Sequence, residues 1–118
     1  MIKKELGIAK KDYASAVVSF EGTNFKWATI QAYYAIFHAA RALLYKHDYR
    51  EESHTALKLA IKELYINSEM LPRSVYDTLE RGMELREMAD YKDSYSKIGA
   101  ESILLAVNLA IAEIEKLL

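Results

Sequence analysis

Cysteine is absent from this chain of 118 residues. The absence excludes disulfide bonds, thiolate metal ligands and a cysteine nucleophile. Three histidines and the carboxylates remain as metal ligands, and their spacing suggests no metal site. No glycine-rich phosphate loop occurs either, because the four glycines are scattered along the chain. We therefore expect no metal and no other cofactor.

Neither sign of charge is in surplus, since 16 Lys and Arg face 17 Asp and Glu for a net charge of -1. Proteins that bind duplex nucleic acid broadly usually carry a basic excess, so this class is disfavoured, although a local basic patch is not. No apolar run reaches the roughly 18 uncharged residues of a membrane span. The N-terminal sequence MIKKELGIAKKDY has no hydrophobic segment of a signal peptide. We expect a cytoplasmic protein without membrane contact.

Glycine and proline are scarce, and no strand-like alternation of apolar and polar residues occurs. Apolar residues recur at helical spacing instead, and polar links separate the segments. This pattern predicts one all-α domain spanning residues 1–118, an antiparallel bundle of four or five helices. We expect helices over residues 2–20, 25–46, 53–67, 72–88 and 96–118, with Ser53 and Ser96 as N-caps and Pro72 in the first turn. In the last helix we expect one broad apolar face made by Ile98, Leu104, Leu105, Ile111, Ile114 and Leu118.

The stretch ATIQAYYAIFHAARALLY, residues 28–45, is the centre of this predicted bundle. It is apolar or aromatic almost throughout and contains neither glycine nor proline. A helix that is apolar nearly all round belongs in a core or at a subunit interface. Its few polar residues fall on one stripe of the predicted helix: Gln31, Tyr34, His38, Arg41 and Tyr45. Aromatic rings beside cations can stack on bases, but such a stripe is more often core or dimer interface.

Arg86 is the clearest candidate for chemistry, because it follows Tyr76, Leu79 and Met83 at helical spacing, where an apolar side chain is expected. One interpretation is an arginine that extends to the rim or pairs with a carboxylate such as Asp90. The other is an anion-binding arginine, since a guanidinium matches the geometry of phosphate. Tyr91 follows five residues later. His54 lies at a junction between link and helix, where a cap or an exposed position explains it, and we give it little functional weight.

Three blocks of the sequence resemble small stand-alone HEPN-domain proteins of bacteria and archaea. The block YYAIFHAARALL at residues 33–44 is similar to their central helix and is fairly specific. The Ser53–His54 pair and LREMADY at residues 85–91 are similar to two further blocks, which would be weak alone. The resemblance extends over residues 9–118. It implies an antiparallel helical bundle, usually a homodimer, often encoded beside a small nucleotidyltransferase in a toxin–antitoxin-like or defence module.

Active HEPN proteins are metal-independent ribonucleases, and the resemblance implies which residues would act here. Their motif is an arginine that binds the scissile phosphate, then four to six residues, then a histidine that helps transfer the 2′-hydroxyl proton. Arg86 occupies the arginine position, but Tyr91 stands where histidine is expected. A phenol of pKa about 10 is ionised to roughly one part in a thousand at pH 7, whereas an imidazole of pKa about 6.5 is mostly available as a base. Tyr91 retains the ability to donate a hydrogen bond to phosphate.

Three functional hypotheses follow from these residues. The first is a homodimeric protein that binds a nucleotide or single-stranded RNA in a cleft lined by Arg86, Tyr91, His38, Arg41 and Tyr34, with a nucleotidyltransferase as partner. The second is an atypical metal-independent endoribonuclease with an Arg-x4-Tyr site, in which Tyr91 or His54 replaces the missing histidine. The third is a non-catalytic interaction module in which the aromatic stripe is interface and Arg86 is a satisfied ion pair. We favour the first.

Overall fold

The computed structural model describes residues 1–50 and 52–118, and within these ranges it contains helices and no strand. The helices are α1 (Ile2–Glu21), α2 (Phe25–Tyr45), α3 (His54–Ile61), α4 (Arg73–Tyr91) and α5 (Lys97–Glu115). A π-helical turn, η1 (Lys62–Ile66), continues α3. The predicted all-α bundle is confirmed.

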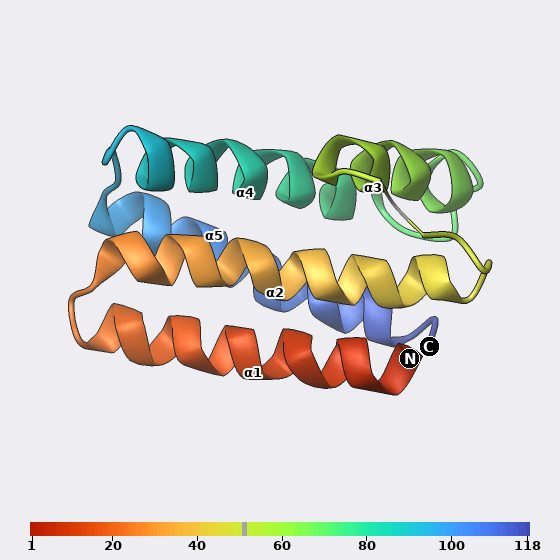
Figure 1. Cartoon of the computed structure of the whole chain (residues 1–118), viewed down its shortest axis with the longest axis horizontal. Coiled ribbons are helices and arrows are strands. Elements are labelled where there is room, and N and C mark those ends of the chain that lie inside the picture. The colour runs from red at the N-terminus through yellow and green to blue at the C-terminus, as the bar shows by residue number, and fades with distance from the viewer. Residues whose placement is uncertain (51) are drawn as a thin grey trace.

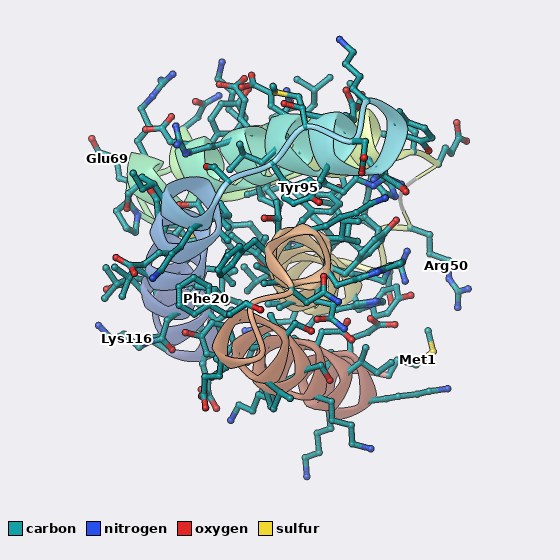
Figure 2. The ribbon with its side chains drawn as sticks, turned by 90° about the vertical axis from the view of Figure 1, so that its left-hand side faces the viewer. Met1, Phe20, Arg50, Glu69, Tyr95 and Lys116 are labelled. Atoms are coloured by element: carbon teal, nitrogen blue, oxygen red, sulfur yellow. The ribbon has the colours of Figure 1, made fainter. Side chains whose placement is uncertain are left out.

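Helix α2 lies at the centre of the bundle. Figure 1 shows α1 antiparallel to it on one side, α3 and α4 on the other, and α5 behind. Seen along the bundle in Figure 2, α2 is surrounded by α1, α5 and α4. Helix α3 lies beside the beginning of α4, and the two chain termini lie at this same end of the molecule (Figure 1). No helix in the described ranges is long and apolar enough to cross a membrane.

The sequence of α2 explains its central position. Thirteen of its 21 residues are buried, and many of these are alanines whose small side chains let neighbouring helices approach closely. The residues left half-buried include every member of the predicted polar stripe: Gln31, Tyr34, His38, Arg41 and Tyr45. The stripe is therefore one half-buried row on a helix whose other residues are buried from Ala28 to Leu44. Asn24 begins the helix, and its side chain accepts a hydrogen bond from the Trp27 backbone.

Most of the predicted helix ends are close to those observed. Ser53 and Ser96 are N-caps whose side chains accept hydrogen bonds from the Ala56 and Gly99 backbone amides. Pro72 stands just before α4 as its N-cap residue rather than inside the first turn. Helix α4 continues to Tyr91, three residues beyond the predicted end, so Tyr91 is helical and not in the following link.

The predicted inward face of α5 is wrong in part. Ile98 is 83% exposed and Leu105 is 63% exposed, whereas Leu104, Ile111 and Ile114 are buried as expected. Helix α5 carries apolar residues on nearly every side, so the spacing alone does not identify the face that meets α2 and α4. The buried face also includes Ala100, Ile103 and Val107.

Gly82 sets how closely α4 lies against α2 next to the candidate site. A Cβ atom at Gly82 would lie 3.2 Å from Cδ1 of Tyr33 and 3.7 Å from Cδ1 of Ile103. Tyr33 is fully buried, so its ring has little freedom to move away. The absence of a side chain at this position lets Tyr33 pack directly against the α4 backbone.

Candidate functional site

Arg86 projects from α4 onto the aromatic row of α2, which consists of Tyr33, Tyr34 and Phe37. Its side chain is only 14% exposed. One terminal nitrogen, Nη2, donates a hydrogen bond of 2.9 Å to the Tyr34 hydroxyl. The guanidinium carbon lies 5.6 Å from the centre of the Tyr34 ring and 5.4 Å from that of Tyr91. Both distances fall within the range of cation–π attraction, so Arg86 is held against two tyrosine rings.

Arg86 keeps its positive charge in the folded protein, but its hydrogen bonding is incomplete. Burial lowers the pKa of the guanidinium, but Tyr34, Tyr91 and Asp90 together outweigh that effect, and its pKa is raised. The nearest carboxylate contact is loose, with 4.0 Å between Nε and Oδ2 of Asp90. The buried Nε has no hydrogen-bond partner among the residues that the structure describes. A low-exposure cation with an unmet donor is suited to an anionic ligand.

The first interpretation of Arg86 holds in part. The side chain does not extend to solvent at the rim, but it forms a long ion pair with Asp90, whose 4.0 Å between Nε and Oδ2 is too long for a hydrogen bond. Tyr91 lies five residues farther along α4 and is 72% exposed. The Tyr91 ring is thus presented to solvent beside the guanidinium, where it can stack on a ligand. Anion binding by Arg86 remains a prediction.

An open hollow of about 350 Å³ adjoins this arrangement on the α2 side. Its lining combines aromatic, basic and hydroxyl groups with one carboxylate: Tyr34, Phe37, His38, Arg41, Glu52, Ser53 and His54. Tyr34 belongs to both features, because its hydroxyl meets Arg86 and it also lines the hollow. Three predicted site residues, Tyr34, His38 and Arg41, therefore share one hollow, and Tyr34 connects them to Arg86 and Tyr91.

His54 lies in the candidate site, although its position between link and helix predicted only a cap or an exposed residue. Its Nδ1 lies 2.8 Å from the Tyr33 hydroxyl. Its ring centre lies 4.5 Å from that of Phe37 and 6.1 Å from that of Tyr34. The imidazole therefore packs into the aromatic row of α2 instead of being exposed. Its position directly after the N-cap of α3 was visible in the sequence, but its partners, about 20 residues away, were not.

The hydroxyl of Tyr33 influences which ring nitrogen of His54 carries the proton. Burial raises the pKa of the Tyr33 hydroxyl far above its ordinary value, and the nearby Arg86 only partly offsets this. The phenol is therefore neutral at physiological pH, with one proton to donate. Among the described residues its hydroxyl contacts Nδ1 of His54, so donation to that nitrogen satisfies it best. This hydrogen bond favours the imidazole tautomer that carries its proton on Nε2.

His38 and Arg41 face a buried carboxylate on α1. Nδ1 of His38 lies 2.7 Å from Oε2 of Glu5, and Nη1 of Arg41 lies 3.8 Å from Oε1 of the same residue. Nε2 of His38 is also 3.8 Å from Asp12, whose pKa burial raises and His38 partly lowers. These contacts join α1 to α2. An anion that entered the hollow would compete with Glu5 for His38 and Arg41.

The assembled groups have a definite chemical capacity. A fixed guanidinium can hold a phosphate, and exposed or half-buried tyrosine rings can stack on a base. An imidazole in the same aromatic row can donate or accept a proton. Within residues 1–50 and 52–118, no group of three His, Asp or Glu side chains is arranged to hold a metal ion.

Comparisons with known proteins agree with this helical architecture. The family described as "HEPN domain" matches residues 2–117. A protein of Methanocaldococcus jannaschii that bears the name "Putative toxin MJ0605" is 28% identical over 118 residues. The similarity covers 99% of this chain and 88% of that protein.

Proposed function

The chain belongs to the HEPN family, and on that premise we propose that it binds a nucleotide or single-stranded RNA at Arg86. The ligand phosphate takes the donors of Arg86, and a base stacks on Tyr91 or Tyr34. His38, Arg41 and His54 line the adjoining hollow and contact the rest of the ligand. The observation that carries this proposal is the cation itself: Arg86 lies against two tyrosine rings, and its Nε has no hydrogen bond within the described residues, only a 4.0 Å contact with Asp90.

The proposal includes a homodimer and a role in a toxin–antitoxin-like or defence module, with a nucleotidyltransferase as partner. Two findings support the module: membership of the HEPN family and similarity to an archaeal protein whose name describes a toxin. A gene for a small nucleotidyltransferase beside this one would strengthen the assignment of the partner.

Equilibrium binding of labelled UMP and of a single-stranded octauridylate tests the site. Replacing Arg86 by alanine should weaken binding of both ligands by about 10- to 100-fold, the value of a charge-assisted hydrogen bond. Arg86→Lys should recover only part of this loss, because an ammonium lacks the planar fork of donors. Arg81→Ala is a matched control, since Arg81 is an exposed arginine of the same helix. Equal binding by Arg86→Ala and Arg81→Ala would disprove the assignment.

A second candidate function is metal-independent RNA cleavage, and the position of His54 is the observation that favours it. His54 lies next to Tyr34, to which Arg86 is bonded, so an imidazole and a guanidinium lie in one site. In this reaction a base takes the proton of the 2′-hydroxyl, whose oxygen attacks the phosphate. The bond to the 5′-oxygen then breaks, and that oxygen receives a proton. Arg86 would stabilise the charge on the phosphate.

An RNA cleavage assay with a chelator present tests this second function. If the reaction depends on His54, His54→Ala should abolish cleavage, whereas Tyr91→Phe should affect it less. The reverse order would point to Tyr91 and the Arg-x4-Tyr site. Cleavage that survives both substitutions together would remove both residues from the mechanism. No cleavage by the wild-type protein, together with tight binding of octauridylate, would leave binding as the function.

A further inference from the structure

Cationic side chains gather along the seam between α3 and α4. Lys58 and Lys62 follow His54 at intervals of four residues, so the three lie on one face of the helix. That face meets α4, because Nζ of Lys58 lies 3.4 Å from Oε2 of Glu80. Figure 1 shows α3 beside the first turns of α4, on the opposite side of the bundle from α1.

These cations converge on a single aromatic ring. Nζ of Lys58 lies 5.8 Å and Nζ of Lys62 lies 5.4 Å from the centre of the Tyr76 ring. The guanidinium carbon of Arg73, at the start of α4, lies 5.7 Å from the same centre. We call Lys58, Lys62 and Arg73 the cationic row. Like charges gathered around one ring repel one another, and physiological salt screens this repulsion over a Debye length of about 8 Å.

Nearby carboxylates offset this repulsion only in part. Glu80 contacts Lys58, and Asp77 lies 3.5 Å from Arg73. In the described part of the chain these two carboxylates pair with members of the row, and no pairing carboxylate is seen for Lys62. The seam therefore has a local positive surplus in a protein whose net charge is -1.

Two members of the row are held in place rather than loosely extended into water. The Lys58 side chain is only 18% exposed and Lys62 is half-buried, whereas the Arg73 side chain is 66% exposed. Their stems pack on the protein, and their ammonium groups are held near Tyr76. A cation that is already positioned loses less conformational entropy when it binds a phosphate.

We propose that the cationic row extends the Arg86 site into a track for the phosphates of a single-stranded polynucleotide. His54 lines the hollow, at one end of this track. Lys62 lies eight residues farther along the chain, a length of about 12 Å at the rise of an α-helix. This length matches roughly three phosphates at the 3.4 Å spacing of a stacked strand. The inference rests on the proposed function and makes it specific: the preferred ligand is a strand of several nucleotides, not a mononucleotide.

The test compares UMP with octauridylate on the full-length protein. The row variant is Lys58→Gln/Lys62→Gln/Arg73→Gln. The control variant, Lys3→Gln/Lys10→Gln/Lys11→Gln, removes the same charge from exposed positions on α1. The row variant should bind octauridylate at least about tenfold more weakly than the control, while its affinity for UMP matches the control. Circular dichroism of each variant establishes that the helices are intact.

Salt dependence provides a second readout. Each phosphate contact to a single strand contributes about 0.7 to the slope of log affinity against log salt concentration. The slope for octauridylate should therefore be shallower by about 2 in the row variant, and unchanged in the control. A reduced affinity without a change of slope would show that the lost contacts were not to phosphates, and would overturn the track.

Each remaining outcome separates the track from the Arg86 site. If Arg86→Ala loses binding but the row variant equals the control, the track is overturned and the site stands. If the row variant loses octauridylate while Arg86→Ala binds as the wild type does, the Arg86 site is overturned. Failure of the wild type to bind either ligand overturns both. Displacement of octauridylate by polyglutamate of equal charge would identify an acidic peptide as the partner instead.

Discussion

At the scale of single residues, Tyr33 connects the fold to the site. It is fully buried, packs against Gly82 and makes a hydrogen bond with His54. In the unfolded chain its hydroxyl loses a proton near pH 10.0, whereas burial keeps it protonated in the folded protein well above that pH. The folded state therefore binds more protons than the unfolded state in alkaline solution, and the free energy of unfolding falls as the pH rises above 10.

Tyr33→Phe should remove this component of alkaline destabilisation. At neutral pH the variant should lose about 0.5–1.5 kcal/mol, because the hydrogen bond to His54 is gone. Above pH 10 its free energy of unfolding should fall less steeply than that of the wild type, by up to about 1.4 kcal/mol per pH unit. Urea unfolding at a series of pH values measures both effects. Tyr95→Phe, at an exposed position, serves as the control; equal slopes for the wild type and Tyr33→Phe would contradict the expectation.

The tautomer of His54 gives a second residue-scale prediction. Because the Tyr33 hydroxyl is best satisfied by donating to Nδ1, neutral His54 should carry its proton on Nε2. Nitrogen chemical shifts of the imidazole at pH 8 distinguish the two tautomers. In Tyr33→Phe the preference for Nε2 should weaken. Finding the proton on Nδ1 in the wild type would mean that the Tyr33 hydroxyl accepts a hydrogen bond from His54. Nε2 would then carry no proton, which would favour His54 as a base for RNA cleavage.

The sequence singled out Arg86 as a candidate and gave His54 little weight, and the reason is physical. Arg86 interrupts an apolar row within its own helix, so the anomaly is local and visible in the spacing. His54 has no such anomaly, because a residue just after an N-cap is normally exposed. Its placement depends on Tyr33 and Phe37, which only the packing of α3 on α2 brings near. Similarly, the engagement of His38 and Arg41 by Glu5 depends on how α1 packs.

At the scale of helices, two glycines in helical positions should respond oppositely to alanine. Nothing lies within 4 Å of a Cβ atom at Gly7, so Gly7→Ala should stabilise α1 by about 0.5–1 kcal/mol. Gly82→Ala would place its Cβ atom 3.2 Å from the Tyr33 ring. The strain of overpacking, about 1–3 kcal/mol, should exceed the gain in helix propensity. Thermal unfolding of both variants checks the signs; stabilisation by Gly82→Ala would mean that α4 shifts freely on α2.

The positions of the helices along the chain were easier to predict than the faces that they bury. The segments of α1 to α5 follow from apolar spacing, polar links and capping serines, all of which are local. The buried face of α5 did not follow, because Ile98, Leu105 and Leu109 are exposed although they are as apolar as their buried neighbours. The π-helical turn after α3 was also not predicted. Its Tyr65 hydroxyl donates to the Leu43 carbonyl, which is a contact between helices.

At the scale of the whole molecule, all five helices contribute to one continuous hydrophobic cluster centred on α2. A single shared core predicts one cooperative unfolding transition. Circular dichroism of the helices and fluorescence of Trp27, the only tryptophan, should therefore give the same midpoint. The unfolding enthalpy should be about 80 kcal/mol near 60 °C for a chain of this length. Separate transitions for the two probes would contradict a single domain.

Nε of Arg86, which has no hydrogen bond within the described residues, affects how this protein tolerates substitution. A buried donor without a hydrogen bond costs about 1–3 kcal/mol, which is a large part of the stability of a small domain. Random substitution followed by selection for heat resistance alone should therefore replace Arg86 readily, whereas selection for ligand binding should retain it. Thermostable descendants that lost this arginine should also lose the ligand binding proposed for it, and position 86 would mark where selection for stability and selection for binding diverge.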